Sequence, residues 1–204
     1  MSLADPQAAA AHARQFWNER YRSFSLSESG WMGAGEVYNQ WLYECKRQAW
    51  QRALALTGTA HGAAVSVLDA GCGQGFFAGA WEREYPAAHY TGVDICEKVV
   101  EHLRGRFPRA EFFTGDLAEW RHPAGCTFDL VQSFEVLHLL LNEVAVARSV
   151  VNLAAQLKPG GHLLTTAVMP ESAVEPNAYI RHPDRRFWQD TAAQAGLRHV
   201  GMVR

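Results

Sequence analysis

Short apolar runs alternate with segments of helical spacing along most of the chain. Residues 65–70 are rich in valine and lead into three glycines at alternate positions, after which residues 76–85 repeat apolar positions at helical spacing. The pattern predicts a strand, a glycine loop and a helix, and similar units follow. The predicted strands are residues 65–70, 89–94, 110–116, 128–134 and 162–169, and the predicted helices are residues 76–85, 96–107, 137–157 and 183–195.

Strands that alternate with helices in this way predict an α/β fold, with a doubly wound, mostly parallel sheet and right-handed crossovers. Such sheets bind ligands beyond the carboxyl ends of their strands, where the strand order reverses. Residues 196–204 predict the beginning of a sixth strand, at which the chain stops. We therefore expect one or more C-terminal strands to be missing.

The first 60 residues are rich in aromatic side chains and have helical spacing. Trp17, Tyr21, Trp31 and Tyr38 are candidates to close over the strand-end cleft as a lid, and the alternative is that they only cover the core. We predict a helical cap over residues 1–60 and a second domain over residues 61–204. The helical face expected to pack on the sheet carries Val37, Trp41, Cys45, Ala49, Ala53 and Leu56.

Composition narrows the class of protein. A formal net charge of −2 with 20% charged residues gives neither a basic nucleic-acid surface nor an acidic tail. No run approaches the roughly 18 apolar residues of a membrane span, and no secretory leader pattern begins the chain. The four cysteines form no CxxC pair, which is typical of reduced thiols. These features predict a cytoplasmic protein, monomeric or homodimeric, with no nucleic-acid or membrane partner.

The glycine loop, GCGQG at residues 71–75, indicates the class of ligand. A dinucleotide fingerprint needs a further glycine where Phe76 stands, and a phosphate P-loop needs Gly-Lys-Ser or Gly-Lys-Thr. Asp69, at the end of the strand before the loop, is poorly suited to a phosphate but well suited to a cation, because buried charges are tolerated chiefly when paired. The loop therefore favours a cationic ligand.

Five segments in order resemble the class I, seven-strand S-adenosylmethionine-dependent methyltransferases, over roughly residues 65–204. They are VLDAGCGQG, GVDIC, TGDLAEW, FDLVQSFEVLHLL and LKPGGHLLTT. The resemblance implies S-adenosylmethionine as cofactor and a small-molecule acceptor. It implies in-line displacement of the methyl group by an O, N or S nucleophile. It also implies an antiparallel seventh strand between the fifth and the sixth.

The resemblance implies roles for the predicted cofactor residues, with Ile95 and Leu117 packed on the adenine and Ser133 near the sulfonium. The glycines lie against the methionine part, where a Cβ would intrude, and Asp69 favours its ammonium. Asp94 accepts from both ribose hydroxyls and Asp116 from the adenine amino group, although a helix N-cap and a turn are the respective structural alternatives. The full set is Trp17, Tyr21, Asp69, Gly71, Gly73, Gly75, Asp94, Ile95, Asp116, Leu117 and Ser133.

The segment FEVLHLL supplies the candidates for catalysis. His138 is the predicted base because imidazole titrates near neutral pH, and Glu135 lies three residues before it. The alternative for His138 is a histidine satisfied by its neighbours at a helix start. Relatives that use a metal have EVLEH here, a pattern that this chain lacks, so no metal is predicted. The predicted substrate contacts are Trp31, Tyr38 and His182, with a solvated helix start as the alternative for His182.

Two other functions stay open. Enzymes with the same fold and a modified cofactor transfer an aminopropyl group, usually with an acidic substrate site in place of EVLH. A catalytically silent relative would act as a partner-binding subunit. Loss of the glycine loop or of the acid in GVDIC would favour that reading, and both are present.

Overall fold

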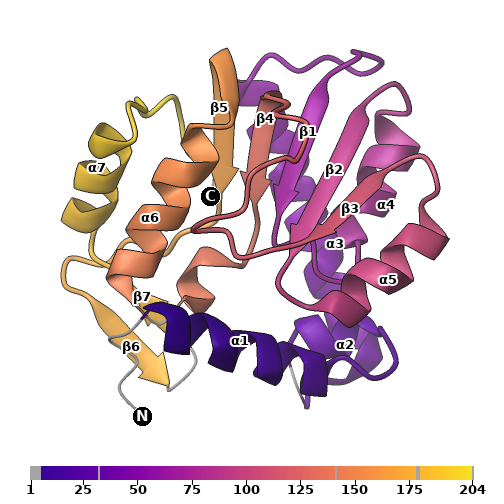
Figure 1. Ribbon diagram of the computed structural model, residues 1–204, viewed down its shortest axis with the longest axis horizontal. Helices are drawn as coiled ribbons and strands as arrows, with labels where there is room; N and C mark the ends of the chain where they lie inside the picture. The colour runs from indigo at the N-terminus through magenta and orange to yellow at the C-terminus, as the bar shows by residue number, and fades with distance from the viewer. Residues whose placement is uncertain (1–5, 32, 141, 178–179, 204) are drawn as a thin grey trace.

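Five parallel strands form the central sheet of the computed structural model, in the order β3-β2-β1-β4-β5 (Figure 1). The structure describes residues 6–31, 33–140, 142–177 and 180–203. Because the order reverses between β1 and β4, the switch point lies at their carboxyl ends. The predicted doubly wound, mostly parallel fold is confirmed. The strands are β1 (Ser66–Ala70), β2 (His89–Asp94), β3 (Glu111–Thr114), β4 (Phe128–Ser133) and β5 (Leu157–Thr165).

Helices cover both faces of this sheet (Figure 1). On one face lie α3 (Gly35–Leu56), α4 (Phe76–Glu84) and α5 (Glu97–Arg106). On the other lies α6 (Glu143–Ala154), with α7 (Arg185–Gln194) packed against it. Successive side chains of β1 point to opposite faces, so Val67 packs with the first group and Leu68 with the second, both fully buried. Burial on both faces explains the near-continuous apolar strands.

The N-terminal helices share the core of the sheet. Helix α1 (Pro6–Arg20) crosses the edge formed by the carboxyl ends of the strands, and the short α2 (Leu26–Ser29) follows it (Figure 1). Tyr21, directly after α1, is buried in one cluster with Trp50 of α3 and Val67 of β1. The division of the chain at residue 60 stays a prediction. None of the helices in the described ranges is long and apolar enough to cross a membrane.

The buried face of α3 is not the predicted one. Val37 and Trp41 are 81% and 62% exposed, and Leu56 is also exposed. The buried positions are instead Asn39, Tyr43, Trp50 and Leu54. Polar partners inside the protein select this face: the Asn39 side chain bonds the backbone of Trp31, and Trp50 Nε1 donates to Gln132 Oε1 at 3.0 Å. Apolar spacing alone does not show such partners.

Residues 137–157 do not form the single helix predicted from their apolar spacing. A short 3-10 turn, η1 (Leu137–Leu139), ends before α6 begins at Glu143. The Asn142 side chain caps α6 by accepting from the Val144 N–H at 2.8 Å. Apolar residues on both sides of this break make it hard to predict from the sequence. Its one signal there is Asn142, a residue type that is favoured at helix N-caps.

The C-terminal third also differs from expectation. The segment between the last predicted strand and the last predicted helix, for which no element is predicted, contains an antiparallel hairpin of β6 (Val174–Asn177) and β7 (Ile180–His182). The predicted sixth strand is absent from residues 197–203, where Val200 and Met202 are exposed. The outer edge of β5 therefore pairs with no strand in the part of the chain that the structure describes.

Candidate functional site

A cleft lies at the carboxyl ends of β1, β2, β3 and β4. This is the edge of the sheet that α1 crosses (Figure 1). Its floor is formed by residues 71–74, 94–95, 115–117 and 134–136, that is, by the glycine loop and the segments after β2, β3 and β4. Trp17 and Tyr21 line it from α1 and the turn that follows. Ser29, Tyr43 and Lys46 line it from α2 and α3. The cleft thus lies at the switch point that the fold predicts.

Two glycines of the loop at residues 71–75 are required by the protein itself, a reason that was not predicted. Gly71 has a φ of +82°, and a Cβ there would lie 2.4 Å from Cγ2 of Val136. Gly75 has a φ of +77° at the N-terminus of α4, and a Cβ there would lie 2.5 Å from Leu103. Left-handed backbone and the protein's own packing therefore exclude side chains at both positions, and the predicted contact with the cofactor stays a prediction.

Asp94 holds the glycine loop to the end of β2. Its Oδ2 accepts from the Gly73 N–H and its Oδ1 from the Cys96 N–H, both at 2.9 Å. Burial raises the pKa of Asp94, while the backbone donors oppose that shift. The two carboxylate oxygens offer about four acceptor positions, so the three backbone donors, from Gly73, Ile95 and Cys96, leave capacity for a ligand in the cleft that Asp94 lines. The residue therefore fits a hydroxyl-bearing ligand. The N-cap of α5 is Cys96, which argues against the N-cap alternative for Asp94.

The structure brings most of the predicted cofactor residues together and leaves three outside the cleft lining. Gly75 is the N-cap residue of α4. Ser133 is fully buried, and its Oγ donates to the Ala70 carbonyl at 3.0 Å. Asp69 is buried and accepts from the Tyr90 hydroxyl. The residues that line the cleft are Trp17, Tyr21, Gly71, Gly73, Asp94, Ile95, Asp116 and Leu117. In addition, Asp116 Oδ1 accepts from the Ala118 N–H at 2.9 Å, as the turn alternative expected.

Asp69 makes folding stability depend on pH. Burial raises its pKa to about 6, with the Tyr90 hydroxyl opposing the shift. A raised pKa means that the folded state prefers the protonated acid. Its contribution is therefore largest below about pH 3.8 and is lost as the pH rises through about 6. We expect the unfolding free energy of Asp69→Asn, relative to the parent, to rise by about 2 kcal/mol between pH 4 and pH 7. Denaturant titrations of both proteins at both pH values measure this change. A difference in unfolding free energy that does not depend on pH would contradict the raised pKa of Asp69.

Gln74 is a cleft residue that the sequence analysis missed. It is buried, its Nε2 donates to the Ser25 carbonyl, and its Oε1 has no partner among the described residues. An unpaired buried acceptor within the glycine loop fits a donor such as an ammonium group. The available signal was a polar residue inside a loop whose neighbours are small or apolar.

The lining of the cleft also includes a pair of opposite charges, Glu135 and Lys46. Glu135, directly after Phe134, has a φ of +60°, and its N–H donates to Thr166 Oγ1 at 2.7 Å. Its Oε2 lies 3.3 Å from Nζ of Lys46 on α3. Lys46 was also missed, because nothing in the sequence places α3 beside the segment after β4.

His138 does not line this cleft, although its neighbours do. Its ring lies 5.7 Å, centroid to centroid, from that of His182 on β7. Burial lowers the pKa of His138, the Glu135 carboxylate opposes this, and His182 and Lys46 add to the lowering. The two histidines thus join the η1 turn to the hairpin. No group of three or more His, Cys, Asp or Glu side chains in the described ranges could hold a metal ion.

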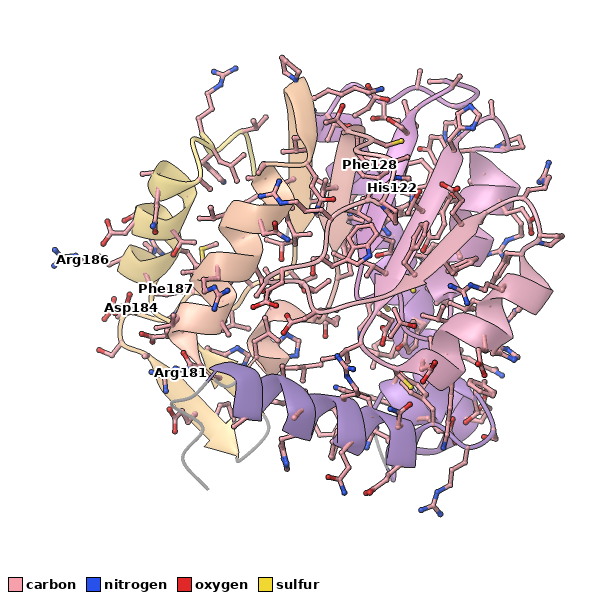
Figure 2. All side chains as sticks on the ribbon, in the orientation of Figure 1. His122, Phe128, Arg181, Asp184, Arg186 and Phe187 are labelled. Carbon is pink, nitrogen blue, oxygen red and sulfur yellow. The ribbon has the colours of Figure 1, made fainter. Side chains whose placement is uncertain are left out.

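The three predicted substrate residues, Trp31, Tyr38 and His182, lie outside the cleft lining. Trp31 is 66% exposed and packs edge-on against Tyr38, with ring centroids 6.4 Å apart. His182 lies beside Arg181, which pairs with Glu143 on α6. Figure 2 shows Arg181, Asp184 and Phe187 where the hairpin meets α7, and Asp184 caps that helix by accepting from the Phe187 N–H. Direct substrate contact by Trp31, Tyr38 or His182 is not supported by these positions.

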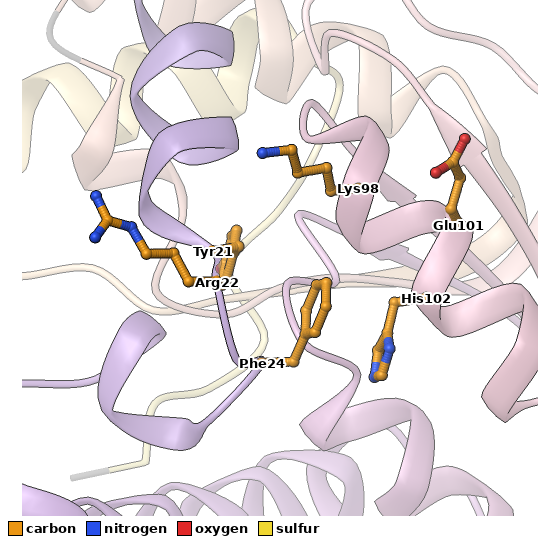
Figure 3. Close-up of a pocket in the computed structure, with 6 residues that line it drawn as sticks. All are labelled: Tyr21, Arg22, Phe24, Lys98, Glu101 and His102. Atoms are coloured by element: carbon orange, nitrogen blue, oxygen red, sulfur yellow. The ribbon is translucent and has the colours of Figure 1, made fainter.

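A second hollow, open to solvent, lies between the turn after α1 and helix α5 (Figure 3). Phe24 and His102 stack in it with ring centroids 4.0 Å apart. It shares only Tyr21 with the cleft and includes none of the glycine loop, Asp94 or Asp116. Most of the motif residues predicted to bind the cofactor therefore line the cleft and not this second hollow.

Comparisons with known proteins agree with this geometry. Residues 67–161 match the family described as a methyltransferase domain. The trans-aconitate 2-methyltransferase of Paracidovorax citrulli is 32% identical over 136 residues, which cover 67% of this chain and 48% of that protein. A probable S-adenosylmethionine-dependent methyltransferase of Mycolicibacterium smegmatis is 30% identical over 165 residues, 80% of this chain and 55% of that protein.

A solved structure has the same fold over most of the chain. It is the magnesium protoporphyrin IX methyltransferase of Synechocystis with bound S-adenosylmethionine, with a TM-score of 0.66 at 18% identity, covering 92% of this chain and 86% of that one. The chain spans about half the length of the curated relatives named above. On the motifs, the fold and these matches, the chain belongs to the class I S-adenosylmethionine-dependent methyltransferase family.

Proposed function

We propose that this chain transfers the methyl group of S-adenosylmethionine to an O, N or S nucleophile of a small molecule. The observation that carries the proposal is the cleft at the switch point, with the glycine loop on one side and Asp94 at the end of β2. The proposal includes a cytoplasmic location, a monomer or homodimer, and no nucleic-acid partner. The bound sulfonium would supply an already activated methyl carbon, so the protein's main task is alignment.

The chain's own residues divide the work of holding the cofactor. Asp94 would accept from the two ribose hydroxyls, and Ile95 and Leu117 would pack on the adenine faces. Asp116 would accept from the adenine amino group through the oxygen that the Ala118 N–H leaves available. Gln74 Oε1 would accept from the ammonium of the methionine part. Trp17 and Tyr21, above the glycine loop, would exclude water from the cofactor.

Calorimetric titration tests the cofactor and release of the product thioether tests turnover. We expect micromolar-range binding of S-adenosylmethionine and none of NAD. Tight NAD binding would overturn the proposal. Cofactor binding without turnover on any acceptor would favour the silent, partner-binding alternative. Two relatives set the first acceptors to test, since their names specify trans-aconitate and malonyl-acyl carrier protein.

His138 and Glu135 stay candidates for catalysis, although only Glu135 lines the cleft, and His138→Ala separates two kinds of acceptor. If the acceptor must lose a proton in the transition state, turnover should fall by about 10²–10⁴-fold and the ascending limb of the pH–rate profile should disappear. If the acceptor is already deprotonated, turnover should be nearly unchanged. In both cases cofactor affinity should stay within roughly twofold, because His138 lies outside the cleft lining. An ascending limb unchanged in His138→Ala removes this residue from proton transfer.

A further inference from the structure

The charges that line the cleft are unevenly distributed. Three carboxylates line it, and Lys46 is its only basic side chain among the described lining residues. Asp94 is occupied by backbone donors and Asp116 by one, and both lie at the end where the cofactor motifs gather. The ammonium of Lys46 lies beside Tyr43 and Glu135, which are not among the predicted cofactor residues.

Lys46 is held in place and partly withdrawn from water. Its side chain is 17% exposed, and its Nζ lies 4.8 Å from the centre of the Tyr43 ring. One carboxylate oxygen of Glu135 lies 3.3 Å from this Nζ, and the Glu135 side chain is 44% exposed. The more buried partner of the pair is therefore the cation. The Glu135 carboxylate at 3.3 Å shows that a carboxylate fits beside this ammonium.

The surroundings of Lys46 combine apolar walls with neutral hydroxyls. The Tyr43 and Phe76 rings lie 4.7 Å apart, and those of Phe77 and Phe134 lie 4.9 Å apart. The Ser29 and Tyr43 hydroxyls are 2.7 Å apart, so one can donate to the other while the second donates to a ligand. Such a site fits a molecule with an apolar body and one anionic, hydrogen-bonding end.

We propose that Lys46 anchors the carboxylate of an acidic acceptor, with Glu135 as the internal carboxylate that the acceptor displaces. This inference rests on the proposed function and names its substrate class. An oxygen of the acceptor carboxylate forms the new bond to the methyl carbon as the carbon–sulfur bond breaks, and the electron pair of that bond goes to sulfur. The products are a neutral methyl ester and a neutral thioether, and no proton moves. A base is then unnecessary, which agrees with His138 facing His182 instead of the cleft.

The test compares acceptors that share a carbon skeleton and differ in charge. Benzoate, 3-phenylpropionate and succinate, each with its amide and its amine, are titrated by calorimetry into the full chain saturated with S-adenosylhomocysteine. At least one carboxylate should bind at least about tenfold more tightly than its amide and amine. Lys46→Met should remove that preference. Glu135→Gln should tighten carboxylate binding severalfold, because the competing internal carboxylate is lost.

Lys158→Met is the matched control, because Lys158 pairs with Asp129 at 2.8 Å and does not line the cleft. It should leave every affinity unchanged. Preference for an amine, no carboxylate preference in any skeleton, or a preference that survives Lys46→Met would overturn the assignment of Lys46. Failure of S-adenosylhomocysteine to bind appears before any acceptor is added; it would overturn the proposed function, and this inference with it.

Discussion

Replacing Trp50 by alanine is expected to lower the free energy of unfolding by about 3–5 kcal/mol, the usual cost of emptying a buried tryptophan site. Trp50 is fully buried, and its ring packs edge-on against Trp81 with centroids 5.2 Å apart. Its Nε1 donates to Gln132 Oε1, which also accepts from Trp81 Nε1. The substitution therefore removes both packing and one of two donors to a buried amide.

Two further variants separate these contributions. Trp50→Phe keeps an aromatic ring but loses the donor, and a loss of about 1–2 kcal/mol is expected because Trp81 still satisfies the Gln132 oxygen. Trp41→Ala, on the exposed face of the same helix, should change stability by less than about 0.5 kcal/mol. Denaturant titration measures all three. A cost for Trp41→Ala equal to that of Trp50→Ala would mean that the orientation of α3 described above is wrong.

Replacing Asp94 by alanine is expected to weaken S-adenosylmethionine binding by about 1.5–3 kcal/mol, or roughly 10- to 150-fold. The substitution removes the acceptors proposed for the ribose hydroxyls. It also releases the N–H groups of Gly73 and Cys96, so the glycine loop loses its tie to β2. Both effects act in the same direction on cofactor affinity.

Asp94→Asn keeps one acceptor oxygen, and its loss of affinity should be smaller than that of alanine. Glu101→Gln serves as control, because Glu101 is an exposed carboxylate on α5 that does not line the cleft. Calorimetric titration gives the affinities, and circular dichroism checks that each variant is folded. Unchanged affinity in Asp94→Ala would remove this residue from the cofactor site.

The sequence predicts the sheet well because parallel strands buried on both faces are read as short apolar runs. The alternation from residue 65 to residue 134 places β1 to β4 within a few residues of their observed bounds. Motif order then places the glycine loop, Asp94 and Asp116 at one edge, because carboxyl ends of parallel strands meet there. This part of the site depends on local sequence and on one rule of topology.

The rest depends on contacts between segments far apart in the chain. The orientation of α3 is set by Gln132, which is 82 residues from Trp50. Lys46 reaches Glu135 only once that orientation is fixed. His138 was predicted as a base from its position after β4, and its partner His182 comes from a hairpin that showed no strand pattern. Periodicity reports which positions are apolar, not which distant group satisfies a buried polar atom.

The absence of a side chain at Gly71 has a consequence for redesign of the cleft. Val136 fills the space that a Cβ would take, so the glycine loop and the segment that carries Glu135 touch without a gap. A bulkier residue at position 136, or a shift of that segment to admit a larger acceptor, pushes on the loop assigned to the cofactor. Selection for new acceptors at residues 134–136 is therefore expected to trade acceptor range against cofactor affinity, and position 43 carries a similar constraint, because the Tyr43 ring lies 4.7 Å from that of Phe76, directly after the loop.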